Sequence, residues 1–203
     1  RVVKRFINSG WPVASLLLEP HAVEALCDDL GTMDVDVPVY VTGPGALRSI
    51  SGYGFHGGAL ALGRRDRSRE GLAPLTDVLS NPNATILAAE GVVHVDNMGG
   101  LFRNGACLGA SGILLSPTCA DPLLRKTVRI STGRVFTIPW TSCPAWPDVL
   151  DQLRSKHGFH LVALETGAGA RPLETLQLAP KTILLVGAEG AGLAPETLRM
   201  CDQ

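Results

Sequence analysis

The chain has 203 residues, of which 45% are hydrophobic and 18% are charged, and its formal net charge is −1. These values are typical of a globular protein with one large domain or two small ones, and they exclude an intrinsically disordered chain. No apolar run approaches the roughly 20 residues of a membrane span, and no segment resembles a signal peptide. Because the net charge is close to zero, composition gives no indication of a nucleic-acid partner.

The five cysteines are scattered, odd in number and without CxxC spacing. This pattern argues against a disulfide framework or a zinc site, so we expect no metal and a reducing, cytoplasmic environment. His157 and His160 are three residues apart, but they straddle a predicted helix–strand junction. We expect no carboxylate or cysteine partner near them, and we interpret both as structural.

The first part of the chain, residues 1–71, is predicted to be a small α/β domain. Apolar segments at 13–18, 37–41 and 58–62 indicate strands, and 21–30 indicates a helix that follows Pro20 and stops at Gly31. The only dense basic cluster follows, with Arg64, Arg65, Arg67 and Arg69. Two interpretations are open for this cluster, a solvated linker and a contact to RNA phosphates.

Residues 72–83 are predicted to link this domain to a second one, with a helix at 72–80 and a turn at 81–83. In residues 84–203, short apolar runs alternate with helical segments, which is typical of βαβ units around a buried parallel sheet. The predicted strands are 84–89, 112–115, 134–139, 159–164 and 182–186. Helices are predicted at about 122–129, at 146–157 and from Pro195 onward.

The segment 91–117 combines a strand end, a loop, a short helix, a second loop and the next strand. Leu101, Gly105 and Leu108 have the spacing of one helix face, so we expect them to face the sheet. We interpret Asn97 at the entrance of this helix and Arg103 one turn inside as a candidate reactive edge. An N-cap role for the Asn and a solvated Arg are the structural alternatives.

A second candidate motif is the glycine-rich segment Gly187 to Leu193, GAEGAGL, directly after a predicted buried strand. It is not the dinucleotide fingerprint GxGxxG, and it lacks the Lys-Ser/Thr of a phosphate-binding loop. Its glycines allow the backbone to approach a flat ligand such as adenine, with Glu189 held at the turn. A plain structural turn is the alternative interpretation.

Together these two stretches resemble the SpoU/TrmH family of RNA ribose 2'-O-methyltransferases, within the knotted SPOUT superfamily. Asn97 and Arg103 match the first motif of that family, and Gly187 to Leu193 match its Gly-x-Glu-Gly-x-Gly-Leu motif. The segment 121–140 is similar to the family's linking segment. The resemblance covers essentially residues 85–203, and the third motif, a Ser-Leu-Asn stretch, is absent from the sequence.

The resemblance implies a SPOUT-type parallel-sheet domain after an N-terminal domain similar to RNA-binding ribosomal proteins. Its trefoil-knot region is expected to be incomplete in this chain, with a further strand and the knot-forming helix following Gln203. S-adenosyl-L-methionine is the expected methyl donor, rRNA or tRNA the expected substrate, and a homodimer the expected assembly. The expected catalytic residues are Asn97, Arg103 and Glu189, and the expected cofactor-binding residues are Thr166, Leu185, Gly187, Gly190 and Gly192.

An RNA-binding protein of the same fold that no longer catalyses is the alternative function. Such a protein would keep the N-terminal domain and need no cofactor. The presence of Asn97, Arg103 and Glu189 argues against it, and the absent third motif argues for it.

Overall fold

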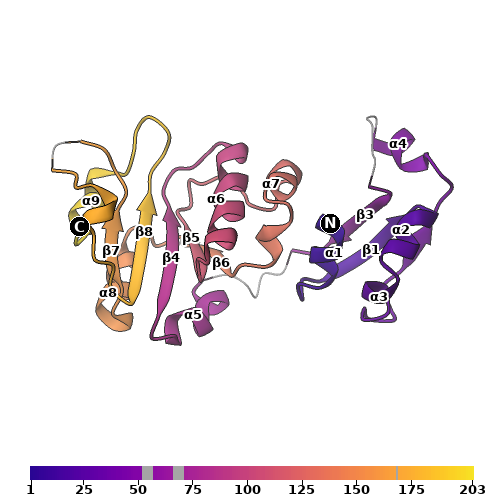
Figure 1. The fold of residues 1–203 in the computed structure, drawn as a ribbon, viewed down its shortest axis with the longest axis horizontal. Helices are drawn as coiled ribbons and strands as arrows, with labels where there is room; N and C mark the ends of the chain where they lie inside the picture. Colours follow the sequence, from indigo (N-terminus) through magenta and orange to yellow (C-terminus); the bar gives the residue numbers. More distant parts are fainter. Residues whose placement is uncertain (52–56, 66–70, 168) are drawn as a thin grey trace. The chain divides into compact units, whose positions relative to one another are not determined.

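The computed structural model describes residues 1–51, 57–65, 71–167 and 169–203 (Figure 1). The chain divides into two compact units, Arg1–Arg67 and Ser68–Gln203, and each has its own sheet. Within the described ranges, no group of three His, Cys, Asp or Glu side chains could hold a metal ion. No helix in the same ranges is long and apolar enough to cross a membrane.

The first unit is built on a three-stranded sheet in the order β2-β1-β3, with β1 parallel to β2 and antiparallel to β3. The strands lie near the predicted segments, and Leu16 and Leu18 of β1 pack with Ala22 and Leu26 in its core. The elements are α1 (Val2–Ile7), β1 (Val13–Leu18), α2 (Pro20–Ala25), α3 (Cys27–Leu30), β2 (Val39–Val41), α4 (Ala46–Ser51) and β3 (Ala59–Gly63).

Two carboxylates connect the helices of this unit to the rest of it. Asp29 accepts a hydrogen bond from Asn8 Nδ2 at 2.7 Å and lies 3.0 Å from Lys4 Nζ, which ties α3 to α1. The Asn8 hydrogen bond and Lys4 lower the pKa of Asp29. Glu19 Oε1 accepts the backbone amides of Gly45 and Leu47 at 3.0 and 3.4 Å, which fixes the start of α4.

The second unit contains a five-stranded parallel sheet in the order β6-β5-β4-β8-β7. This confirms the predicted α/β class with a buried parallel sheet. The elements are η2 (Ala73–Leu75), α5 (Thr76–Ser80), β4 (Ala84–Ala89), α6 (Val95–Leu108), β5 (Gly112–Leu115), α7 (Arg125–Ile130), η3 (Arg134–Phe136), β6 (Trp140–Ser142), α8 (Asp148–His157), β7 (His160–Ala163), η4 (Leu173–Thr175), β8 (Lys181–Val186) and α9 (Pro195–Met200).

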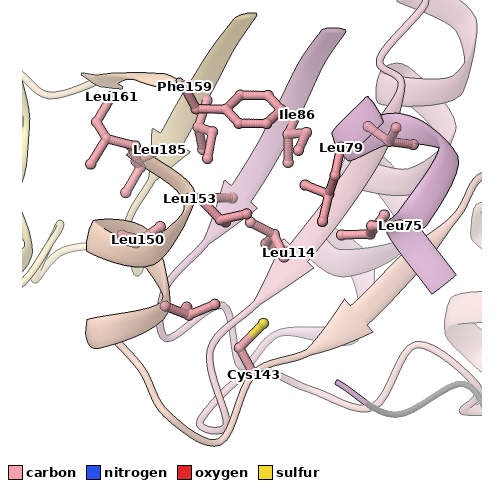
Figure 2. Packing of buried hydrophobic residues seen from close by; sticks show 14 of the residues in the cluster. Leu75, Leu79, Ile86, Leu114, Cys143, Leu150, Leu153, Phe159, Leu161 and Leu185 are labelled. Carbon is pink, nitrogen blue, oxygen red and sulfur yellow. The ribbon is translucent and has the colours of Figure 1, made fainter. Parts of the chain in front are cut away.

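Both faces of this sheet are covered, which explains why its strands are apolar without alternation. On one face, Ile86 and Leu185 pack in a cluster with Leu150 and Leu153 of α8 (Figure 2). Leu75, from the segment expected to be a linker, is fully buried in the same cluster. On the other face, α6 and the segment around η3 cover the sheet with a second apolar cluster, which includes Phe102, Ile113 and Val135.

Two details of the sequence interpretation are wrong. Leu108 does not face the sheet, because it is 87% exposed; the buried positions of α6 are Met98, Gly99, Phe102 and Gly105. The predicted strand 134–139 instead contains the 3₁₀ turn η3, and β6 begins at Trp140. Gly133, with φ of +80°, redirects the chain before this turn, and Phe136 donates its amide back to the Gly133 carbonyl.

His160 also differs from expectation, because it has a carboxylate neighbour. Its Nδ1 lies 3.3 Å from Asp202 Oδ2, and the same oxygen accepts the Leu161 amide at 2.8 Å. Ala163 donates its amide to the Gln203 carbonyl at 2.8 Å. The segment after α9 is therefore hydrogen-bonded along β7.

Adjacent glycines of α6 provide a test of its packing against α7. A Cβ on Gly99 would meet Ile130 Cβ at 2.6 Å, whereas a Cβ on Gly100 would meet nothing within 4 Å. We expect Gly99→Ala to lower the melting temperature, since overpacking costs about 1–3 kcal/mol. Gly100→Ala should raise it, because alanine is favoured over glycine in a helix by about 0.8–1.0 kcal/mol. Differential scanning calorimetry of both variants measures this, and equal shifts would contradict the α6–α7 contact.

Candidate active site

A cleft of about 470 Å³ opens where β4 and β8 end. Parallel neighbours end at the same edge of a sheet, so the segments that follow β4 and β8 lie side by side there, with the start of α6. The cleft is lined by residues of the loop after β4 (Gly91, Val92, Val93, His94), of α6 (Asp96, Asn97, Gly100, Leu101, Asn104) and of the end of β8 and its following loop (Val186, Gly187, Ala188, Glu189).

Helix α6 presents two asparagines, a glycine and a leucine to this cleft. Asn97, Gly100, Leu101 and Asn104 are three or four residues apart, so they share one face. The buried face packs on the sheet, and the ring of Phe102 meets Trp140 edge-on with centroids 5.9 Å apart. The apolar packing thereby fixes the direction in which the polar residues point.

One hydrogen bond joins the two sequence motifs across the cleft. Asn97 Nδ2 donates to Glu189 Oε2 at 3.0 Å, although the two residues are 92 positions apart. Because the carboxylate holds the amide nitrogen, the Asn97 Oδ1 atom is oriented as an acceptor. Both residues are exposed, so the main effect of the bond is on orientation rather than on stability.

The glycine-rich segment forms a narrow loop closed by two backbone hydrogen bonds between Ala188 and Gly192, at 2.9 and 3.1 Å. Gly190 and Gly192 have φ of +88° and +70°, which favours glycine at both positions. Gly187 is required for space, since a Cβ there would lie 2.1 Å from the Gly192 carbonyl carbon. The expected glycine-dependent turn is therefore present.

Two carboxylates outside both sequence motifs hold this loop in place. Glu165 Oε1 accepts the Leu193 amide at 2.5 Å, and Glu90 Oε2 accepts the Ala194 amide at 3.4 Å. They follow β7 and β4, so they connect the loop to both strands beside β8. Neither residue belongs to a local motif, which is why no sequence signal pointed to them.

Arg103 is exposed on α6 and does not line the cleft. It lies one turn beyond Gly99, on the side of α6 that contacts α7. Near this side, Asp96 pairs with Lys126 of α7 at 2.8 Å. The structure thus brings Asn97 and Glu189 together and places Arg103 outside their cleft.

The expected cofactor residues are spread over two loops and one strand. Gly187 lines the cleft, Gly190 is exposed, and Gly192 lies against the Glu165 carboxylate. Thr166 is exposed after β7, and the Leu185 side chain is fully buried in the core. Only backbone atoms of Leu185 are therefore available to a ligand.

The basic cluster is only partly described by the structure. Arg64 and Arg65 are exposed after β3 in the first unit. Arg67 and Arg69 lie outside the described residues. The two interpretations of the cluster both remain predictions.

Known proteins are similar in sequence to this chain. Residues 84–203 match the SpoU rRNA Methylase family. An uncharacterized tRNA/rRNA methyltransferase of Mycobacterium bovis is 31% identical over 99% of this chain and 68% of its own length. The chain belongs to the SpoU rRNA methylase family. This confirms the predicted family and the predicted class of enzyme, an RNA methyltransferase.

Solved structures share the fold of this SpoU-family chain. An rRNA methyltransferase from Sinorhizobium meliloti superposes with a TM-score of 0.79 at 24% identity, over 98% of this chain and 73% of that one. The SpoU methyltransferase AviRb from Streptomyces viridochromogenes, in complex with the cofactor AdoMet, gives a TM-score of 0.78 at 24% identity, over 100% of this chain and 76% of that one.

A Gly→Ala substitution in the glycine loop of this SpoU-family chain tests the close backbone approach at Gly187. Gly187→Ala should displace the loop, because its Cβ would meet backbone atoms of Gly192 and Leu193. We expect faster hydrogen exchange at the Ala188 and Gly192 amides. Gly190→Ala is the control, since its Cβ has open space and only the left-handed backbone costs about 1–2 kcal/mol. Unchanged exchange in Gly187→Ala would contradict the close approach.

Proposed function

We propose that this protein transfers a methyl group from S-adenosyl-L-methionine to a ribose 2'-hydroxyl of rRNA or tRNA. The observation that carries the proposal is the Asn97–Glu189 hydrogen bond, which unites the two family motifs beside a glycine-rich loop. A relative with this activity in its name supports the proposal. The 23S rRNA (uridine(2479)-2'-O)-methyltransferase of Streptomyces viridochromogenes is 31% identical over 52% of this chain and 38% of its own length.

The described residues fit S-adenosyl-L-methionine at the glycine loop. The backbone amides of Glu189, Gly190 and Ala191 make no hydrogen bond to another described residue, so they are available to a polar ligand. A Cβ on Gly190 would meet nothing within 4 Å, so the loop is open there. We assign the backbone of Thr166, Leu185, Gly187, Gly190 and Gly192 to this ligand, which supplies the methyl group when bound.

In the proposed reaction, the ribose 2'-oxygen attacks the methyl carbon, the carbon–sulfur bond breaks and the hydroxyl proton leaves. The leaving sulfide needs no acid, so the protein's task is to align the hydroxyl and to help its proton depart. We assign the alignment to Asn97, whose Oδ1 can accept a hydrogen bond from a ribose hydroxyl. Glu189 holds the Asn97 amide in that orientation.

Arg103 is proposed to clamp the neighbouring phosphate and to stabilise charge that develops on the 2'-oxygen. Its exposed position outside the cleft is consistent with a site completed by a second protomer, and we propose a homodimer. Light scattering of the purified protein tests the assembly. We also propose a cytoplasmic location, where rRNA and tRNA substrates occur.

An Arg103 substitution tests the assigned role. We expect Arg103→Ala to lower methyl transfer by about 10²-fold or more, since a preorganised charge is lost. Affinity for S-adenosyl-L-methionine should stay nearly unchanged, because Arg103 lies outside the glycine loop. Calorimetry and tritium transfer measure the two quantities, with Cys107→Ala as the control on the same helix. More than half of the activity in Arg103→Ala would exclude the assigned role.

The basic cluster leads to a separate prediction about RNA affinity. Replacing Arg64, Arg65, Arg67 and Arg69 with Gln should weaken RNA binding and reduce the salt slope of the binding constant by up to about 3, because phosphate contacts release counterions. Filter binding at several salt concentrations measures this, with Lys156→Gln as a single-charge control. If the RNA affinity and its salt slope are both unaltered, the cluster does not contact RNA phosphates and is a solvated segment.

The alternative is an RNA-binding protein of the same fold without catalysis. It predicts that S-adenosyl-L-methionine leaves the melting temperature unchanged, whereas a ligand that binds the folded state raises it. Mapping of 2'-O-methyl sites in RNA from cells with and without the gene then identifies the substrate.

A further inference from the structure

The cleft is larger than the Asn97–Glu189 pair requires. Its volume of about 470 Å³ falls within the roughly 300–1,000 Å³ of small-ligand sites. It extends along α6 from Asn97 to Asn104, a rise of about 10 Å at about 1.5 Å per residue. The ribose role proposed for Asn97 accounts for one end of the cleft, and the Asn104 end has no assigned ligand.

The charges of the cleft argue against a phosphate as that ligand. None of its described lining residues is Lys or Arg. The Asp96 carboxylate is paired with Lys126, but the Glu189 carboxylate contacts only the neutral Asn97 amide among the described side chains. Exposed cations lie on the neighbouring helix α7, at Arg125, Lys126 and Arg129. A neutral group therefore fits the cleft better than a phosphate.

The shape of the cleft suits a flat group. Gly100 lies between Asn97 and Asn104 and leaves bare helix backbone there, because a Cβ would meet nothing within 4 Å. Val93, which is 60% exposed, and the exposed His94 belong to the loop that lines the cleft with α6. Apolar and imidazole surfaces of this kind stack on nucleobases.

We infer that this cleft binds the base of the nucleotide to be methylated, with Gly100 as its floor and Asn104 as its specificity-determining residue. The Asn104 amide offers both a donor and an acceptor, which matches the polar edge of a base. The inference rests on the proposed function for the position of the ribose. The absence of a side chain at Gly100 is then a requirement of the ligand, since the helix itself would be more stable with alanine.

Nucleoside binding tests the cleft without any catalysis. In ¹⁵N-labelled wild-type protein, a panel of the four ribonucleosides should shift the amide signals of Gly100, Leu101 and Asn104. The 5'-monophosphates should bind no more tightly, because the cleft offers them no cation. Gly100→Leu should abolish the shifts, whereas Leu108→Ala, outside the cleft, should keep them. Shifts that are absent in the wild type, or unchanged in Gly100→Leu, overturn the inference.

Activity measurements separate this inference from the proposed function. Gly100→Ala and Asn104→Ala should lower kcat/KM for RNA about tenfold or more, while S-adenosyl-L-methionine binding stays unchanged and Gly100→Ala melts no lower than wild type. Wild-type kcat/KM in both variants overturns the base-binding role. If the wild-type protein methylates no RNA, the proposed function is overturned instead. The nucleoside-induced amide shifts would still show whether the cleft binds a base.

Discussion

The parallel pairing of β4 with β8 is the constraint on which the site depends. Six residue pairs align these strands from Ala84–Lys181 to Ala89–Val186, so the segments that follow them emerge together. The apolar layers on both faces hold this pairing, because each strand contributes side chains to both layers. The hydrogen bond between Asn97 and Glu189 is thus positioned by the apolar packing on the two faces of the sheet.

Much of this arrangement could be predicted from local patterns. Strands β4, β5 and β8 are apolar runs bounded by turn residues, and the two motifs follow β4 and β8. The strand predicted at 134–139 is wrong because a short apolar run indicates burial without fixing the backbone conformation. Val135 and Ile138 are buried there although the chain forms the 3₁₀ turn η3. The prediction for Leu108 is wrong because helix periodicity does not say where the covered part of a helix ends.

The remaining site residues depend on three-dimensional neighbours. Glu165 and Glu90 accept amides 28 and 104 positions away, and no local pattern encodes such a distance. Gly99 and Gly100 look alike in the sequence, yet one lies against Ile130 and the other borders open space. The different surroundings of the two glycines appear only when α6 packs against α7. Gly99 is therefore needed for helix packing, whereas Gly100 shapes the proposed binding surface.

The strand order has a consequence for the sequence of events in folding. β8 is the last of the five strands to be synthesised, yet it occupies the place between β4 and β7. Strand pairings so distant in sequence form slowly, because the entropy of closing a long loop is lost before the strand contacts stabilise the chain. Until β8 is inserted, β7 lacks its neighbour in the described sheet, and Asn97 has no Glu189 to orient it. The first unit has its own core, so it can fold on the ribosome well before the cleft of the second unit exists.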